Sequence, residues 1–112
     1  MTVIEIENIN DLQSLLNQPE TLVLVDCYAL WCGPCKRIAP ELVKLQERFN
    51  NENKNVKICK MDIEKSSDIR EWVYNVNVVS VPTFFLLRDR KVLEKIEGAN
   101  INKIEEAILK YL

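Results

Sequence analysis

Residues 22–35 read LVLVDCYALWCGPC, an apolar run that leads into two cysteines separated by a glycine and a proline. The run Leu22–Tyr28 is almost unbroken in hydrophobicity, which is typical of a central strand buried on both faces. After the second cysteine, apolar residues recur at helical spacing at Ile38, Leu42, Leu45 and Phe49. The segment therefore predicts a buried strand that passes into a helix, with Cys32 and Cys35 at the junction, where sites collect in α/β sheets.

Strands and helices are predicted to alternate along the rest of the chain. Further strands are expected at residues 3–6, 56–63, 82–87 and 91–96, and further helices at residues 9–16, 66–74 and 101–112. The polar stretch Asn50–Asn55 indicates a surface turn, and the short link 88–90 indicates an antiparallel hairpin. Because the first strands alternate with helices, we expect parallel pairing there. The product is an α/β fold with a mixed sheet and helices on both faces.

The composition excludes several classes of protein. The 112 residues fit a single domain, residues 1–112, and the 47% of hydrophobic residues suffice for a core. The net charge of −2 comes without a basic patch for nucleic acid or a polybasic stretch for a membrane surface. No apolar run approaches the roughly 18 residues that cross a bilayer. Histidine is absent, which excludes Ser-His-Asp and Cys-His catalysis and every zinc site that needs imidazole.

The N-terminal residues, MTVIEIE, contain no basic segment followed by an apolar one and are too acidic for a transit peptide. We therefore expect the protein in a reducing compartment, the cytoplasm. A form processed from an organellar precursor would share this composition. In a reducing compartment, four cysteines more often serve catalysis or metal binding than a disulfide framework.

Cys32 and Cys35 are expected to play different roles, although they stand only three positions apart. Cys32 is predicted at the helix N-terminus, where unpaired backbone N–H groups and the helix dipole stabilise a thiolate. Cys35 is predicted inside the first turn, facing the sheet. We therefore predict that Cys32 attacks a substrate disulfide and that Cys35 resolves the mixed disulfide. Because Pro34 lacks an N–H donor, the Gly33-Pro34 pair limits the stabilisation of the thiolate and favours a reducing dithiol.

Two other uses of the cysteine pair are disfavoured. Zinc needs four ligands, and the chain offers only Cys27, Cys59 and carboxylates beyond the pair, with no second C-x-x-C. A purely structural disulfide would close a very short loop, which adds little stability, and a reducing compartment would open it. We expect Cys27 and Cys59 to be buried in strands as free thiols that pack like small hydrophobes.

Motifs along essentially the whole chain resemble the thioredoxin family. The resemblance is carried by Val25–Asp26, Ala29, Trp31–Lys36, Pro40, Val81–Thr83 and Gly98. It implies the thioredoxin fold, with five strands in the order 1-3-2-4-5. It also implies a protein-disulfide reductase, a monomeric thiol–disulfide oxidoreductase and electron carrier with a redox-active Cys32–Cys35 disulfide and no bound cofactor. Its partners would be disulfide-containing proteins and a thioredoxin reductase that uses NADPH.

The same resemblance assigns a role to Asp26, which lies in a strand too hydrophobic for an ordinary carboxylate. Burial would raise its pKa. Asp26 would then act as the general base that deprotonates Cys35 through water. The alternative is a structural carboxylate paired with a lysine, and Lys60 in the neighbouring strand is the candidate partner.

Substrate binding is assigned by resemblance to residues around the cysteines. Pro82 resembles the family's cis-proline beside the active site, and the backbone of Val81 would hydrogen-bond an extended substrate segment. An apolar rim would be formed by Trp31, Val79, Val81 and Ala99. Because Trp31 directly precedes Cys32, which we expect to be surface-exposed, it is predicted to contact the substrate.

Several positions depart from the family pattern. Tyr28 stands where tryptophan is usual. Leu30 replaces a residue that is more often polar or charged, which would alter the contact surface and the choice of partner. The turn at 88–91 lacks the usual glycine, so it is expected to be longer or differently shaped. The alternative functions are a specialised member of the family, such as a reductase dedicated to one partner, and a redox-sensing binding module.

Overall fold

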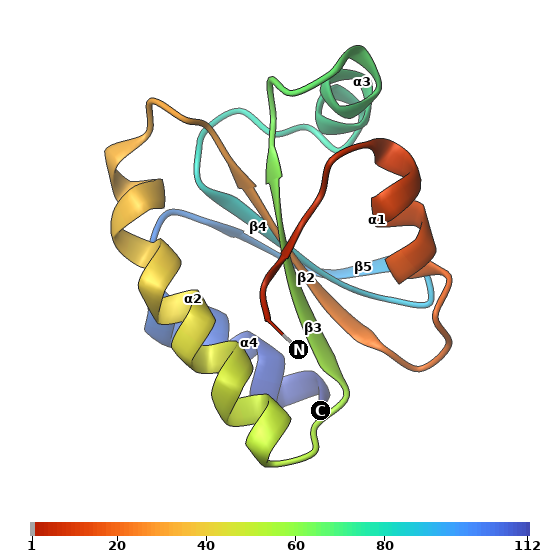
Figure 1. The fold of residues 1–112 in the computed structure, drawn as a ribbon, viewed down its shortest axis with the longest axis vertical. Coiled ribbons are helices and arrows are strands. Elements are labelled where there is room, and N and C mark those ends of the chain that lie inside the picture. The colour runs from red at the N-terminus through yellow and green to blue at the C-terminus, as the bar shows by residue number, and fades with distance from the viewer. Residues whose placement is uncertain (1) are drawn as a thin grey trace.

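A mixed sheet of five strands forms the centre of the molecule, in the order β1-β3-β2-β4-β5 (Figure 1). The computed structural model describes residues 2–112. Its strands are β1 (Ile4–Glu5), β2 (Leu22–Tyr28), β3 (Val56–Asp62), β4 (Thr83–Arg88) and β5 (Lys91–Glu97). β3 pairs in parallel with both β1 and β2, whereas β4 is antiparallel to β2 and to β5. The predicted strand order and mixed pairing are confirmed.

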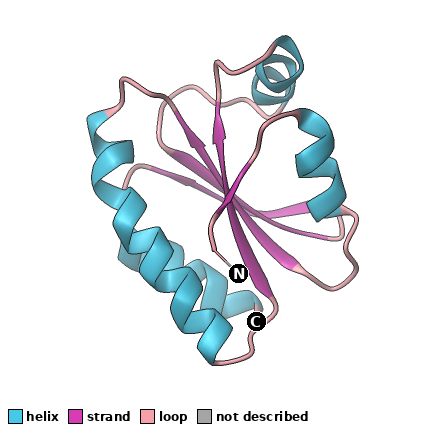
Figure 2. Cartoon of the chain, in the orientation of Figure 1, coloured by secondary structure: helices cyan, strands magenta, loops and turns pink. Residues whose placement is uncertain are grey.

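Helices cover both faces of this sheet (Figure 2). They are α1 (Ile9–Leu16), α2 (Gly33–Asn51), α3 (Ser67–Asn75) and α4 (Ile101–Tyr111). α2 and α4 lie on one face, and α1 and α3 lie on the other (Figure 1). α1, α3 and α4 begin after Asn8, Ser66 and Asn100, whose side chains each accept a backbone N–H of the first turn, as N-cap residues do. No helix within residues 2–112 combines the length and apolar character needed to cross a membrane.

β2 divides the core into two halves, because side chains alternate between the faces of a strand. Val23 and Val25 pack on the side of α1 and α3, whereas Leu22 and Leu24 pack on the side of α2 and α4. Asp26 follows Leu24 by two residues and therefore shares its face. The alternation thus directs a carboxyl group toward the helix that carries the cysteines.

The end of α2 differs from the prediction. The expected turn at Asn50–Asn55 is wrong for its first two residues, which belong to the helix. Gln46, fully buried, donates from Nε2 to the carbonyl oxygen of Val56 at 2.9 Å and to Asn50 Oδ1 at 3.1 Å. Its Oε1 accepts the backbone N–H of Ile58 at 2.6 Å. These bonds tie the last turns of α2 to β3, so the helix extends further than local polarity predicts.

The hairpin between β4 and β5 is closed by Asp89 and Arg90, with φ angles of 50° and 68°. The turn is therefore tight: of the two expected forms, longer or differently shaped, the longer one is wrong. Positive φ at both central residues matches the twist of the flanking strands, and aspartate tolerates this conformation. Asp89 Oδ1 also accepts the backbone N–H of Glu20 at 3.2 Å. The guanidinium of Arg90 donates to Gln13 and Asn17, so contacts with α1 and the loop after it support a turn without glycine.

Candidate active site

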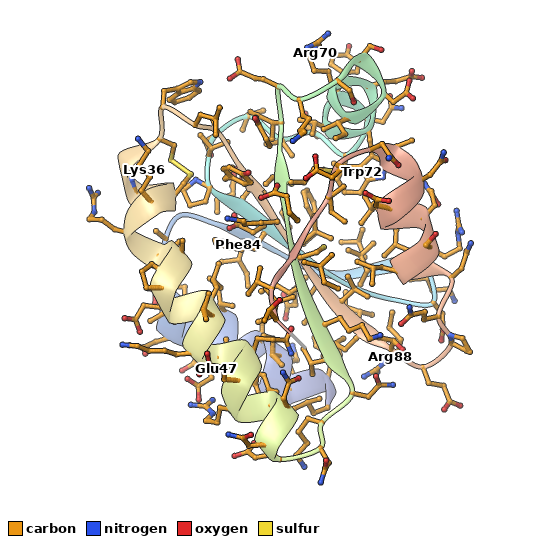
Figure 3. All side chains as sticks on the ribbon, viewed as in Figure 1. Lys36, Glu47, Arg70, Trp72, Phe84 and Arg88 are labelled. Atoms are coloured by element: carbon orange, nitrogen blue, oxygen red, sulfur yellow. A yellow bond between two sulfur atoms is a disulfide. The ribbon has the colours of Figure 1, made fainter. Side chains whose placement is uncertain are left out.

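The two cysteines of the motif lie at the junction of β2 and α2, as the sequence predicts. Cys32 is the N-cap residue of α2, and Pro34 lies in the first turn. Cys32 and Cys35 form a disulfide, with their Cα atoms 5.3 Å apart (Figure 3). The backbone N–H of Cys35 donates to Cys32 Sγ at 3.2 Å. The sulfur of Cys32 thus takes the place of a capping oxygen, at a position that favours a negative charge.

The disulfide is buried, although the two residues directly before it are exposed. Cys32 and Cys35 are each only 4% exposed, so the expectation of a surface-exposed Cys32 is wrong for the disulfide form. Val81 packs against the cluster that the two cysteines form with Ala29. By contrast, the side chains of Leu30 and Trp31 are 67% and 68% exposed. The two residues directly before Cys32 thus present apolar side chains to solvent, whereas the cysteines themselves are buried.

Asp26 lies beneath α2 and is almost completely buried. Its Oδ1 has no hydrogen-bond partner among residues 2–112. Burial raises the pKa of Asp26 to about 7; the positive charge of Lys60 opposes this rise, and the negative charge of Glu5 adds to it. The pKa is therefore raised as predicted, into the range in which a carboxyl group exchanges a proton near neutral pH.

A cavity of about 110 Å³ joins Asp26 to the active-site helix. It is lined by Asp26, Tyr28, Ala29, Leu30, Cys35, Lys36, Ala39 and Lys60. Of the two cysteines in the disulfide, Cys35 contributes to the wall and Cys32 does not. The volume is large enough for several water molecules, so a proton can pass between Cys35 and Asp26 without direct contact of their side chains.

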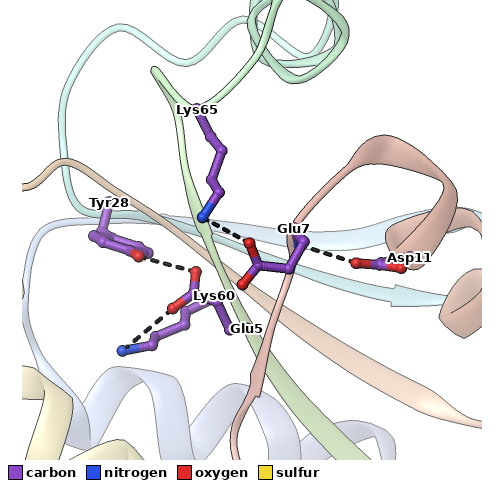
Figure 4. Close-up of polar contacts among 6 residues, drawn as sticks. All are labelled: Glu5, Glu7, Asp11, Tyr28, Lys60 and Lys65. Atoms are coloured by element: carbon purple, nitrogen blue, oxygen red, sulfur yellow. Dashed lines mark hydrogen bonds and ion pairs between the residues drawn. The ribbon is translucent and has the colours of Figure 1, made fainter.

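Lys60 is a neighbour of Asp26, because the β2–β3 register pairs the two residues. Its ammonium group forms an ion pair with Glu5, from Nζ to Oε1 at 3.6 Å (Figure 4). The hydroxyl of Tyr28 donates to the second carboxylate oxygen of Glu5 at 2.9 Å (Figure 4). The prediction that Lys60 pairs with Asp26 is therefore corrected. The lysine acts on Asp26 through its charge, but its ion-pair partner is Glu5.

Glu5 is the residue of this site that the sequence analysis missed. It lies in β1, opposite Lys60 in the β1–β3 register. One signal was present, because a charged residue stands between Ile4 and Ile6 in a predicted strand. The partner of Glu5 cannot be predicted from that signal until the pairing of β1 with β3 is known.

The predicted substrate rim is partly assembled in the structure. The peptide bond between Val81 and Pro82 is cis, as predicted. Val81 contacts the cysteine pair, and Ala99 lines a surface pocket together with Pro34 of α2. Val79 is exposed to 74% two residues before Val81. The segments around Val81 and Ala99 thus come next to the active-site helix, although both are far from it in sequence.

The two remaining cysteines lie in the other half of the core. Cys27 and Cys59 are completely buried among the residues that pack under α1 and α3. Burial raises the pKa of both thiols, so they stay protonated and pack as small hydrophobes. Within residues 2–112, no group of three or more cysteine or acidic side chains is placed to hold a metal ion.

A cysteine pair that can open and close a disulfide at a helix N-terminus exchanges electrons with the thiols and disulfides of other molecules. This makes the protein a thiol–disulfide oxidoreductase. Residues 3–110 match the family model for thioredoxin. The chain is 35% identical over 107 residues to thioredoxin-3, mitochondrial, of Saccharomyces cerevisiae, an alignment that covers 96% of this chain and 78% of that protein.

Solved structures show the same relationship. The X-ray structure of Fasciola hepatica thioredoxin superposes with a TM-score of 0.87 at 30% identity, covering 98% of this chain and 100% of that chain. A chain in the crystal structure of the complex of ferredoxin:thioredoxin reductase and thioredoxin f2 superposes with a TM-score of 0.84 at 28% identity, covering 97% of this chain and 94% of that one. This chain belongs to the thioredoxin family. It is a protein-disulfide reductase that works by dithiol–disulfide exchange, with a disulfide as its redox-active group.

Proposed function

We propose that Cys32 is the attacking thiol of this reductase and that Cys35 is the resolving thiol. The observation that carries the proposal is the capping of α2 by Cys32, whose Sγ accepts the backbone N–H of Cys35 at 3.2 Å. In the reduced protein, the same donor and the helix dipole stabilise a thiolate at Cys32. Gly33 and Pro34 lie between the two cysteines, and Pro34 has no backbone N–H to donate. Because this donor is missing, the Cys32 thiolate is stabilised less, which keeps the dithiol reducing.

The exchange takes place in two steps. The Cys32 thiolate attacks one sulfur of the substrate disulfide, a mixed disulfide forms, and the other substrate sulfur leaves as a thiolate. Cys35, once deprotonated, attacks Cys32 Sγ, so the Cys32–Cys35 bond forms and the bond to the substrate breaks. The substrate has gained two electrons, and the protein has lost them.

Asp26 takes the proton of Cys35 through water in the cavity that both residues line. A pKa of about 7 supports this role, because such a carboxyl group is partly ionised near neutral pH and can accept a proton there. The positive charge of Lys60 opposes the rise in the pKa of Asp26, and the negative charge of Glu5 adds to it. Asp26 thus deprotonates the resolving Cys35, whereas the N-terminus of α2 stabilises the thiolate of the attacking Cys32.

An extended segment of the substrate docks beside the disulfide. The contact residues are Trp31, Val79, Val81, Pro82 and Ala99. β4 begins only at Thr83, so the backbone of Val81 lies outside the sheet ladder and can pair with a substrate strand. The exposure of Trp31 supports an apolar contact at the other side of the disulfide.

The reaction cycle needs a partner that reduces the Cys32–Cys35 disulfide again. We assign this role to a thioredoxin reductase that draws its electrons from NADPH. One structure similar to this chain is a complex of thioredoxin f2 with ferredoxin:thioredoxin reductase, which supports a reductase as the partner; NADPH as the electron source follows from the family resemblance. We further propose that the protein acts as a single-domain monomer in a reducing compartment, the cytoplasm, where Cys27 and Cys59 stay reduced.

Reduction of insulin disulfides in the presence of NADPH and a thioredoxin reductase tests these assignments. The wild type should reduce insulin, and Cys32→Ser should not. Cys35→Ser should form a mixed disulfide with a substrate and hold it, because the resolving thiol is missing. Accumulation of that mixed disulfide in Cys32→Ser instead of Cys35→Ser would reverse the two roles.

A reductase dedicated to one partner is the second candidate function, and the exposure of Leu30 favours it. An apolar side chain exposed to 67% beside Trp31 enlarges the apolar contact surface. Mixed disulfides captured from a cell extract by Cys35→Ser distinguish the two candidates. Many captured proteins indicate a general reductase, and a single captured protein indicates a dedicated one.

A further inference from the structure

Glu5, Lys60 and Asp26 form one row across three neighbouring strands. The β1–β3 register pairs Glu5 with Lys60, and the β2–β3 register pairs Lys60 with Asp26. The lysine therefore stands between two carboxyl groups. It is bound to one of them, with Lys60 Nζ 3.6 Å from Glu5 Oε1 (Figure 4). Oδ1 of Asp26 has no hydrogen-bond partner in the described chain, residues 2–112.

Tyr28 helps to hold this arrangement. Its hydroxyl donates to Glu5 Oε2 at 2.9 Å, so both oxygens of Glu5 are engaged. Lys60 Nζ lies 5.5 Å from the centre of the Tyr28 ring, which is within the range of a cation–π contact. The ammonium group is thus held by two side chains, neither of which is Asp26.

The other elements packed around Asp26 provide one more cation. β4 contributes Phe84, the register partner of Asp26, which carries no charge. α2 contributes Cys35 and Lys36 to the shared cavity. Cys35 is held in the disulfide, and Lys36 is exposed to solvent on the helix. Lys60 is therefore the cation that the sheet itself sets beside Asp26.

We propose that Glu5 is a positioning residue of the disulfide exchange: by binding Lys60 it withholds the ammonium group from Asp26 and sets the pH range in which Asp26 exchanges its proton. The consequence for catalysis rests on the proposed role of Asp26. A cation within about 4–6 Å of a carboxylate lowers the pKa of that carboxylate by roughly one to three units. Glu5 opposes the lowering of the Asp26 pKa in two ways: it binds the ammonium group of Lys60, and its own negative charge raises the pKa.

Withholding the ammonium group serves the resolving step. If Lys60 were bound to Asp26, the carboxylate would be a weaker base and would draw the proton from Cys35 less readily. With Lys60 bound to Glu5, Asp26 keeps a higher affinity for a proton and can accept one from Cys35 more readily. Glu5 touches neither cysteine, so it acts through Lys60 and Asp26 alone.

The test is a pH titration of the Asp26 carboxyl carbon by NMR in the oxidised full chain. Glu5→Gln keeps the size of the side chain and removes its charge. The Asp26 midpoint should fall by about one pH unit. Glu7→Gln is the matched control, because it removes the same charge from a residue that pairs with Lys65 at 2.7 Å instead. A midpoint unchanged in Glu5→Gln, or moved equally in both variants, overturns the proposal.

The same substitution in a Lys60→Met protein distinguishes the binding of Lys60 by Glu5 from the direct effect of the Glu5 charge on Asp26. In Lys60→Met no ammonium group can be withheld, so adding Glu5→Gln should move the Asp26 midpoint much less than it does in the wild type. A shift of full size in that background overturns the positioning role. The pH dependence of insulin reduction is recorded in parallel. If Glu5→Gln moves the Asp26 midpoint but not the pH–rate profile, control of the titration by Glu5 stands and the proposed role of Asp26 in proton transfer is contradicted.

Discussion

The protein contains two pairs of cysteines with opposite chemistry, and burial does not separate them. Cys32 and Cys35 are 4% exposed, and Cys27 and Cys59 are 0% exposed. The difference lies in what surrounds the sulfur. Cys32 caps a helix and accepts a backbone N–H at 3.2 Å, whereas Cys27 and Cys59 pack among apolar side chains of a sheet. A thiol becomes reactive through donors aimed at its sulfur and a partner at disulfide distance.

The same contrast holds for two adjacent residues of β2. Asp26 and Cys27 are neighbours in sequence, but their side chains lie on opposite faces of the sheet. Burial raises the pKa of both side chains. The pKa of Asp26 reaches about 7, where proton exchange is useful, and that of Cys27 moves far from neutrality. Each residue therefore takes its role from the half of the core that it enters.

The largest expected effect comes from removing Cys32, and the matched removal of Cys27 should have almost none. Cys32→Ser should lower the rate of insulin reduction by at least about a thousandfold, because the nucleophile is lost. Cys27→Ala should reduce insulin at close to the wild-type rate per folded molecule. Both rates are measured with NADPH and a thioredoxin reductase. A folded Cys27→Ala protein without activity would remove the functional contrast between the pairs.

Asp26→Asn should make the oxidised protein more stable at alkaline pH. Between the ordinary pKa of 3.8 and the folded value of about 7, the folded protein holds a proton that the unfolded chain releases. The free energy of unfolding of the wild type therefore falls as the pH rises through this window. At pH about 8 the variant should be more stable by up to about 4 kcal/mol, at 1.36 kcal/mol per pKa unit. Guanidinium unfolding at pH about 5 and about 8 measures the difference, and equal pH slopes would contradict the prediction.

Substitutions of Cys59 should affect stability and leave catalysis intact. Cys59→Ser buries a hydroxyl in an apolar core and should cost about 1–3 kcal/mol in the free energy of unfolding. Cys59→Ala removes the sulfur without adding a polar group, and should cost less. Urea unfolding compares the two variants, and insulin reduction provides the activity control. A larger loss in Cys59→Ala would mean that the volume of the sulfur matters more than its polarity.

The smallest expected effect is a change in the reduction potential of the Cys32–Cys35 disulfide. Pro34→His places an imidazole and an N–H donor beside Cys32, which stabilises the thiolate and raises the reduction potential. A rise of roughly 30–60 mV is expected, where 30 mV corresponds to about a tenfold change in the equilibrium constant. Equilibration with glutathione buffers measures it. Pro34→Ala restores the N–H without the imidazole and should account for only part of the rise; an equal rise would assign the whole effect to the N–H.

Local signals explain which elements could be predicted. The apolar run of β2 and the spacing of apolar residues in α2 depend on neighbours within a few residues, so β2 and the start of α2 lie where expected. Contacts between distant segments explain the corrections. Gln46 bonds to β3 and lengthens α2, and Asp89 bonds to the loop before β2 in the tight hairpin. The surroundings of the cysteine cluster include Val81, which is distant in the sequence.

The chemistry proposed for the exchange can be predicted from the sequence, because Cys32, Pro34 and Cys35 lie within one turn at the start of the same helix. The sequence also determined that Asp26 is buried, since its strand is apolar on both sides. The charges around that carboxyl group depend instead on how distant strands pair. β1 pairs with β3, and this sets Glu5 opposite Lys60 and Lys60 beside Asp26. Strand pairing joins residues that are distant in the chain, so the electrostatics of the site arise from the assembled sheet.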